Sequence, residues 1–200
     1  MIECYNTLVV GIGGQGILTV AEILARAGML QGFKVLMAEI HGMAQRGGRV
    51  PCSVRFGDSI HSAQIPEGAA NLVISLEFAE VLTALPFSSG STAFVINRQI
   101  LTPPMITIGQ GRYPKTDEVI SSVKKVSQRV FEIDALEIAR RVGLQSAVNS
   151  VMLGAGVAAG RVPVEKHSII EAMKTVLSER SLEVNVRAYE MGYSEITKRN

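Results

Sequence analysis

The feature that most constrains the fold is a glycine-rich turn between an apolar run and a helix. Residues 7–10 read Thr-Leu-Val-Val, which is typical of a buried parallel strand. The turn that follows consists of Gly11, Ile12, Gly13, Gly14, Gln15 and Gly16. Apolar and small residues then recur at helical spacing over 15–31, and a second apolar run follows at 35–38. This order predicts a strand–helix–strand unit of a parallel sheet.

The rest of the chain continues this alternation and then becomes helical only. Alternating residues over 49–56 predict a half-exposed strand, and Pro51 indicates that it lies at the sheet edge. A turn at Gly57-Asp58 predicts that this strand returns through 59–62 as a hairpin. Further strands are expected at 71–77, 93–97 and 129–133, and helices after 77 to about 85, from Thr116, from Asp134, and at about 149–160, 164–178 and 182–198.

These elements predict an α/β fold with a Rossmann-like, doubly wound and mostly parallel sheet, a β-hairpin edge and a C-terminal helical pack. A length of 200 residues fits one domain. We therefore expect a single domain over 1–200, with a sheet core at 1–148 and helices at 149–200.

Composition excludes several classes of protein. The formal net charge is only +2 and no run of five like charges occurs, which argues against a nucleic-acid binder. No apolar run approaches the roughly 20 residues of a membrane-spanning helix, and no secretory leader is visible, so a cytoplasmic location is expected. Two cysteines, Cys4 and Cys52, lack the spacing of a zinc site and are too few for an iron–sulfur cluster. The three histidines are far apart in sequence, so no metal site is expected.

The glycine-rich turn has two interpretations. Gly11, Gly13 and Gly16 fit G-x-G-x-x-G, and with Gly14 and Gln15 they could hold a cofactor phosphate at the start of the helix. Glu39 ends the next strand, where an acidic residue would meet a ribose in a dinucleotide-binding protein. The alternative is that the glycines serve only to pack the helix on the sheet.

A second candidate site follows this strand, at 39–48. His41 can transfer protons near neutral pH, Gln45 can donate and accept hydrogen bonds, and Arg46 can bind a carboxylate or phosphate through two bonds. The alternative is a solvent loop whose side chains satisfy its own backbone. A third feature, Asn149 with the small residues of 153–156, is expected to let another helix pack closely, and Asn149 could cap its own helix.

Three segments resemble one known family. GIGGQG at 11–16, EIHGMAQRGG at 39–48 and IPEGAANLVISLE at 65–77 are similar to the gamma domain of 2-oxoacid:ferredoxin oxidoreductases. HGMAQRGG in particular resembles the small (beta) subunit of the indolepyruvate branch. The resemblance extends through 149–156 and the following helices, and so covers nearly the whole chain.

This resemblance implies a subunit that is not active alone. A large alpha subunit would carry thiamine diphosphate, Mg²⁺ and 4Fe–4S clusters, with coenzyme A as co-substrate and ferredoxin as electron acceptor. No cofactor would be bound by this chain by itself. His41, Gln45 and Arg46 would face the shared active site, and the glycine-rich turn would serve packing or a phosphate of coenzyme A.

Two other functions remain open from the sequence. A stand-alone NAD(P)-dependent oxidoreductase would bind a nicotinamide dinucleotide at the glycine-rich turn, whereas a purely structural subunit would use the turn and the loop only for docking. The isolated chain is also expected to be capable of forming a homodimer.

Overall fold

The computed structural model describes residues 4–39, 48–101 and 112–199. Six strands in these ranges form one sheet in the order β2-β3-β1-β4-β5-β6. Their bounds are Tyr5–Val10 for β1, Val35–Glu39 for β2, Cys52–Phe56 for β3, Ala70–Ser75 for β4, Ser88–Asn97 for β5 and Val130–Ile133 for β6. Strand β1 is buried at every position, including the polar Asn6 and Thr7 that precede its apolar residues.

The sheet is mostly parallel, and β3 alone among these strands runs against the others. β1, β4, β5 and β6 pair in parallel, whereas β3 pairs antiparallel with both β1 and β2. The predicted antiparallel edge is therefore present, but it consists of β2 and β3.

Two details of the predicted hairpin are wrong. Residues 59–62 form no strand, and β3 lies inside the sheet, between β2 and β1. Pro51 does not mark an edge because it precedes Cys52, the first residue of β3, where a missing amide costs no ladder bond.

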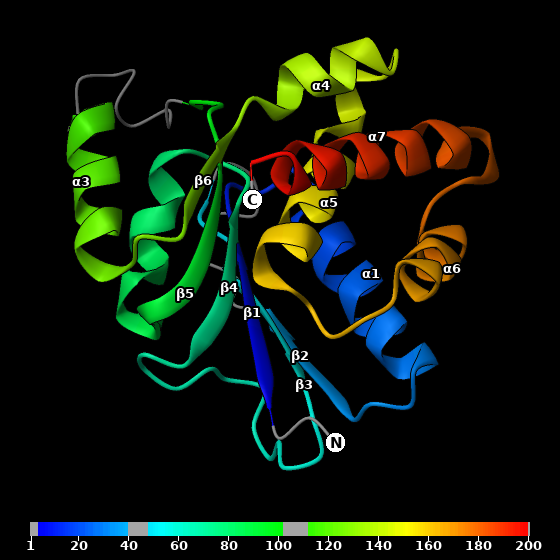
Figure 1. Cartoon of the computed structure of the whole chain (residues 1–200), viewed down its shortest axis with the longest axis horizontal. Coiled ribbons are helices and arrows are strands. Elements are labelled where there is room, and N and C mark those ends of the chain that lie inside the picture. The colour runs from blue at the N-terminus through cyan, green and yellow to red at the C-terminus, as the bar shows by residue number, and fades with distance from the viewer. Residues whose placement is uncertain (1–3, 40–47, 102–111, 200) are drawn as a thin grey trace.

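Helices cover both faces of the sheet (Figure 1). One face carries α1 (Ile17–Leu30), α5 (Val148–Gly160), α6 (Lys166–Val176) and α7 (Glu179–Thr197), and the other carries the 3₁₀ segment η1 (Ala79–Phe87) and α3 (Thr116–Val126). Helix α4 (Ala135–Arg141) and the short η2 (Gln145–Ala147) connect β6 to α5. Each face has its own cluster of buried apolar side chains.

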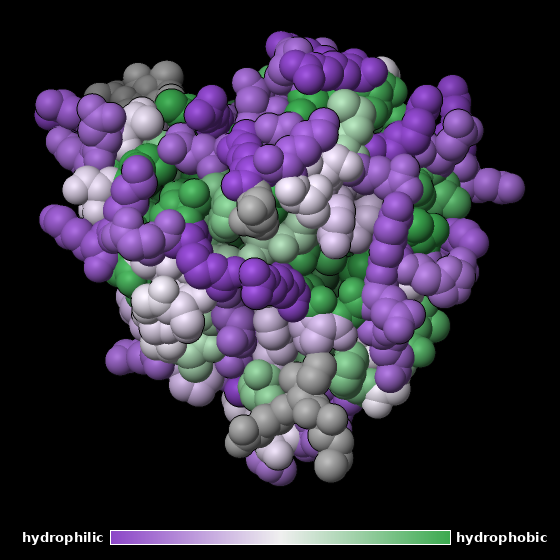
Figure 2. All heavy atoms as spheres, in the orientation of Figure 1, coloured by the Kyte–Doolittle hydropathy of each residue, from purple (hydrophilic) through white to green (hydrophobic). Residues whose placement is uncertain are grey.

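The C-terminal helices are packed closely onto the sheet. Gly154 of α5 and Gly192 of α7 each face the backbone of the other helix so closely that a methyl group would overlap it. Gly156 likewise leaves room for Ile74 of β4, because a Cβ there would lie 2.8 Å from a side-chain carbon of Ile74. The predicted close packing of the small-residue helix is confirmed. In the space-filling view, apolar side chains gather over α1 and α6, among charged ones (Figure 2).

Candidate functional site

A cleft lies where the direction of the chain connections reverses. β1 connects through α1 toward β2, whereas β4 connects through η1 to β5 on the other side. Open α/β sheets bind ligands at such a point, outside the carboxyl ends of the strands. The cleft here has a volume of about 470 Å³. Uncharged groups line it, namely Gly14, Gln15, Gly16, Leu76, Gln99, Leu101, Leu136, Gln145, Ser146, Val148 and Asn149.

Contacts within the chain hold the glycine-rich turn in place. The amide of Gly13 donates to the carbonyl of Gly48 at 3.0 Å, and the carbonyl of Gly11 accepts from Val50 at 3.0 Å. The Gln15 side chain closes the turn, because its Oε1 accepts from the amide of Ile12 at 2.8 Å and its Nε2 donates to the carbonyl of Leu76 at 3.0 Å. The amides of Ile12 and Gly13 therefore already donate to protein groups and are not available to a phosphate.

Gly16 is the position in the turn where a side chain would do most harm. Its φ of 81° is left-handed, and it serves as the N-cap of α1. A Cβ there would lie 2.5 Å from Nδ2 of Asn149. Asn149 lies inside the first turn of α5, whose N-cap is Ala147 without a side-chain bond, so the predicted cap at Asn149 is wrong. Asn149 instead brings its amide group to the glycine-rich turn.

Glu39 does not lie where a ribose-binding carboxylate would. It ends β2, and β3 separates β2 from β1, so that it is two strand spacings, or about 10 Å, from the strand that leads into the glycine-rich turn. Its neighbour across the ladder is Cys52, which is fully buried. Burial, together with the charge of Glu39, raises the pKa of the Cys52 thiol to about 12.

His41, Gln45 and Arg46 lie outside the described residues. The two flanks of their segment are described, and both are at the carboxyl ends of the parallel strands. Glu39 is the last residue of β2, and Gly48 accepts the bond from Gly13 in the glycine-rich turn. The structure thus relates the two predicted sites at 11–16 and 39–48 through this bond and through the bridge between Ile12 and Arg49.

An acidic cluster beside the cleft was not singled out from the sequence. Glu77 follows β4 with 1% of its surface exposed. Its carboxylate accepts from the hydroxyl of Tyr113 at 2.6 Å, and from the amides of Ala79 at 2.8 Å, Glu80 at 3.1 Å and Leu101 at 3.1 Å. Glu77 thereby joins the start of η1 to chain segments 24 and 36 residues further on. The sequence signal that could have indicated this cluster is an acidic residue two positions after a buried strand.

Glu80 extends this cluster toward the second predicted site. Its carboxylate lies 3.2 Å from Nε of Arg49, the residue that follows Gly48. Burial raises the pKa of Glu80 and the charge of Glu77 raises it further, while Arg49 opposes both effects. Burial and the bond to Glu77 also raise the pKa of the Tyr113 hydroxyl.

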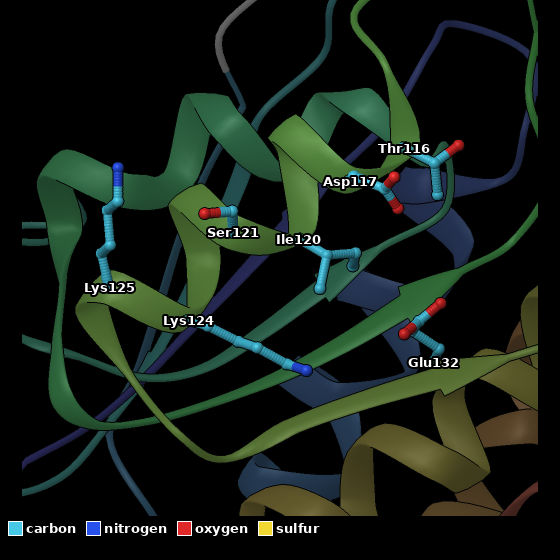
Figure 3. Close-up of a pocket in the computed structure, with 7 residues that line it drawn as sticks. All are labelled: Thr116, Asp117, Ile120, Ser121, Lys124, Lys125 and Glu132. Atoms are coloured by element: carbon cyan, nitrogen blue, oxygen red, sulfur yellow. The ribbon is translucent and has the colours of Figure 1, made fainter.

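A different hollow, of about 540 Å³, lies at the β6 edge of the sheet. Lys124 of α3 and Glu132 of β6 reach into it from opposite sides, with Thr116, Asp117 and Ser121 along the helix (Figure 3). Its lining is charged and contains none of the predicted site residues.

Within 4–39, 48–101 and 112–199, no three His, Cys, Asp or Glu side chains are grouped as around a metal ion. In the same ranges, no helix is both long and apolar enough to span a membrane.

The fold is that of the gamma subunits of oxoacid:ferredoxin oxidoreductases. The keto/oxoacid ferredoxin oxidoreductase gamma subunit from Geobacter sulfurreducens superposes with a TM-score of 0.70 at 21% identity, over 97% of this chain and 99% of that one. The 2-oxoglutarate:ferredoxin oxidoreductase from Magnetococcus marinus superposes with a TM-score of 0.73 at 18% identity, over 99% of this chain and 32% of that one.

Comparison of the sequence with known families and proteins assigns the chain more narrowly than the fold does. The model of the pyruvate ferredoxin/flavodoxin oxidoreductase family matches residues 6–195, and the chain belongs to this family. It is 40% identical to the indolepyruvate oxidoreductase subunit IorB of Archaeoglobus fulgidus, over 95% of this chain and 94% of that one. It is 38% identical to IorB of Methanothermobacter thermautotrophicus, over 94% of this chain and 96% of that one. The predicted family, and the prediction of an oxidoreductase subunit, are confirmed.

Proposed function

We propose that this chain is the small subunit of an indolepyruvate:ferredoxin oxidoreductase, which converts aryl pyruvates to acyl-coenzyme A by oxidative decarboxylation. The observation that carries the proposal is the 40% identity to an IorB subunit along nearly the full length of both chains. The motif at 39–48, which resembles the indolepyruvate branch, supports the same assignment.

The cofactors of this reaction would lie on a large alpha subunit. The described residues offer no cluster of metal-binding side chains, so we assign thiamine diphosphate, Mg²⁺ and the 4Fe–4S clusters to that subunit. When bound there, these groups supply decarboxylation of the oxoacid and electron transfer to ferredoxin. The small subunit would complete the shared cleft and exclude water from it.

Within this subunit, we assign the contact with the reacting groups to His41, Gln45 and Arg46. Two observations support this assignment: the flanks of their segment lie at the carboxyl ends of the strands, and Arg49 pairs with Glu80 just beyond it. An Arg guanidinium there could bind the carboxylate of the oxoacid or of a partner residue through two parallel bonds. His41 could hold or move a proton near neutral pH.

The glycine-rich turn we assign mainly to packing, with coenzyme A as the ligand that its cleft would accept. The lining of amide and hydroxyl groups suits hydrogen bonding to a neutral polar segment of such a ligand, and any phosphate would have to rely on the start of α1. A nicotinamide dinucleotide is disfavoured because β3 separates Glu39 from the turn and the amides of Ile12 and Gly13 donate elsewhere.

Copurification with the large subunit, followed by dye reduction with a panel of 2-oxoacids, tests the function. We expect indolepyruvate and other aryl pyruvates to support faster turnover than pyruvate or 2-oxoglutarate. In the same assay, Arg46→Ala should lower kcat/KM by about 10²-fold if a charged bidentate contact is lost, with Arg140→Ala on α4 as a surface control. Turnover by the small subunit alone would contradict the proposal. An Arg46→Ala complex that assembles and turns over normally would remove Arg46 from the site.

A further inference from the structure

The two edges of the sheet differ in how they are protected from pairing with a strand of another molecule. At the β6 edge, Arg199 donates to the backbone carbonyl of Glu132 at 3.0 Å, and Arg98 lies 3.5 Å from the Glu132 carboxylate. Lys124 reaches toward the same strand from α3 (Figure 3). Charged side chains on an edge strand discourage pairing with another strand. The β6 edge is therefore built to stay unpaired.

The β2 edge is less protected among the residues that the structure describes, because its one charged residue, Glu39, is the last of the strand. β2 pairs with β3 on one side, and its sequence Val-Leu-Met-Ala-Glu contains no lysine and no proline. The amide of Gly57 donates to the carbonyl of Lys34 at 3.1 Å. In an antiparallel ladder the bonding direction alternates, so the backbone groups of Val35 and Met37 point to the open side. This edge can accept another strand.

An apolar groove lies beside this open edge. We call it the β2 groove; its apolar lining is Ala25, Met29 and Leu30 of α1 with Val35 and Met37 of β2, and its volume is about 670 Å³. Met29 is 64% exposed, Leu30 60% and Met37 43%, which makes them three of the six large apolar side chains that are exposed in the described part of the chain. Apolar surface gathered in one place beside an open strand marks an interaction site.

We propose that the β2 groove is the interface with a second copy of this chain, in which the two β2 strands pair antiparallel about a two-fold axis at Met37. Met37 is the middle residue of the five-residue strand, so a strand paired with its own copy places Met37 opposite Met37 of the second copy. The sheet then continues from one copy into the other, and neither β2 edge stays open.

The dimensions of the groove agree with this arrangement. Helix α1 packs chiefly on β3, so the two α1 helices would be separated by three strand spacings, or about 14 Å. Directly packed helices lie roughly 8–10 Å apart, which leaves a gap of about 4–6 Å between the copies. Met29, Leu30 and Met37 of both copies would fill that gap, and flexible methionine side chains suit such a space.

The charged residues around the β2 groove also favour a second copy of this chain as its occupant. The charged residues at the rim are Glu22 and Arg26, which pair with each other at 2.7 Å. The rim is therefore neutral as a unit, and two identical rims do not repel each other. A partner selected by charge would require an excess of one sign at the rim.

The oligomeric state of the full-length chain tests the proposal. By light scattering after gel filtration, we expect the wild-type chain at twice the 21.5 kDa of the monomer. Met37→Lys would place two ammonium groups face to face at the axis and should raise the dimer Kd by at least about 100-fold. Leu18→Lys is the control and should leave the dimer intact. Leu18 also lies on α1 and is 39% exposed, but it is outside the groove.

A cross-link tests the register and does not depend on the behaviour of the lysine variant. Residues opposite each other in antiparallel strands have Cα atoms roughly 4.5–5.5 Å apart, within the range of a disulfide. Met37→Cys, in a Cys4→Ser background, should form a covalent dimer under mild oxidation, and the background alone should not. A monomeric wild-type chain, a Met37→Lys variant as dimeric as the wild type, or a Met37→Cys variant that forms no cross-link would each overturn the proposal. So would a monomeric wild-type chain whose assembly with the large subunit is blocked by Met37→Lys, because the groove would then belong to that subunit.

Discussion

At the scale of single residues, the chemistry beside the cleft depends on side chains that meet only after folding. Glu77 and Glu80 bond to partners that are 24 to 36 residues away along the chain, namely Leu101, Arg49 and Tyr113, and these residues share one hydrogen-bonded cluster. The sequence singles out the glycine-rich turn and the segment at 39–48 as candidate sites because each carries its signal locally. It did not predict the acidic cluster, because no local pattern shows which donors will reach a buried carboxylate.

Glu80 leads to a prediction about pH. Burial raises its pKa above the ordinary value of 4.5, and the exposed Arg49 only partly opposes this. A raised carboxyl pKa means that Glu80 contributes stability that is fully present below pH 4.5 and is lost as the pH rises through the raised pKa. We therefore expect the free energy of unfolding of the wild type, relative to Glu80→Gln, to increase as the pH is lowered from 7 toward 4.5.

Denaturant unfolding at a series of pH values measures this difference. Glu67→Gln serves as the control, because Glu67 is an exposed glutamate in the loop before β4. A difference between wild type and Glu80→Gln that is independent of pH, or that grows as the pH rises, would contradict the assignment.

At the scale of elements, local periodicity predicted nearly every strand and helix of the described chain but not the order of the strands. The run at 49–56 has the alternation of a strand, and residues 52–56 form one, but all five are buried, so the prediction of a half-exposed strand is wrong. Its place between β2 and β1 depends on pairing with residues some 45 positions earlier, which no local pattern encodes. The failed strand at 59–62 has the same origin: β3 found its partners in β1 and β2.

The contact between α5 and α7 yields a prediction at this scale. Gly→Ala inside a helix ordinarily stabilises a protein by roughly 0.5–1 kcal/mol. At Gly154 the sign should reverse, because a Cβ would overlap the backbone of Tyr189 and lie 2.9 Å from the amide nitrogen of Tyr193. We expect Gly154→Ala to cost about 2–3 kcal/mol and to lower the Tm by about 5–10 °C.

Gly90→Ala is the comparison, because the nearest atom to a Cβ there, the carbonyl oxygen of Val126, is 3.8 Å away. Thermal melts followed by circular dichroism should leave Gly90→Ala near the wild type. If Gly154→Ala melts at or above the wild-type temperature, the two helices are less tightly packed than we describe.

At the scale of the whole molecule, the C-terminal helices are part of the core of the sheet. One apolar cluster contains Val9 of β1 and Ile74 of β4 together with Leu153 of α5 and Tyr189 of α7. The Tyr5 hydroxyl in β1 also donates to the carbonyl of Gly160, the last residue of α5, at 2.7 Å. Removal of residues 149–200 would expose to water the part of one sheet face that α5 covers, so residues 1–148 cannot bury all of their apolar surface.

We therefore expect the chain to unfold in one cooperative step. The chain has four tyrosines and no tryptophan, and Tyr5 in the sheet and Tyr189 in α7 report on its two parts. Near-ultraviolet circular dichroism of the tyrosines and far-ultraviolet dichroism of the backbone should give coincident thermal transitions. Because either part alone leaves its share of the common cluster exposed, the fragment 1–148 should show neither a native tyrosine signal nor a cooperative melt. Two separated transitions in the full chain would instead mean that the helices leave the sheet before it unfolds, and that the shared cluster stabilises the two parts much less than its burial implies.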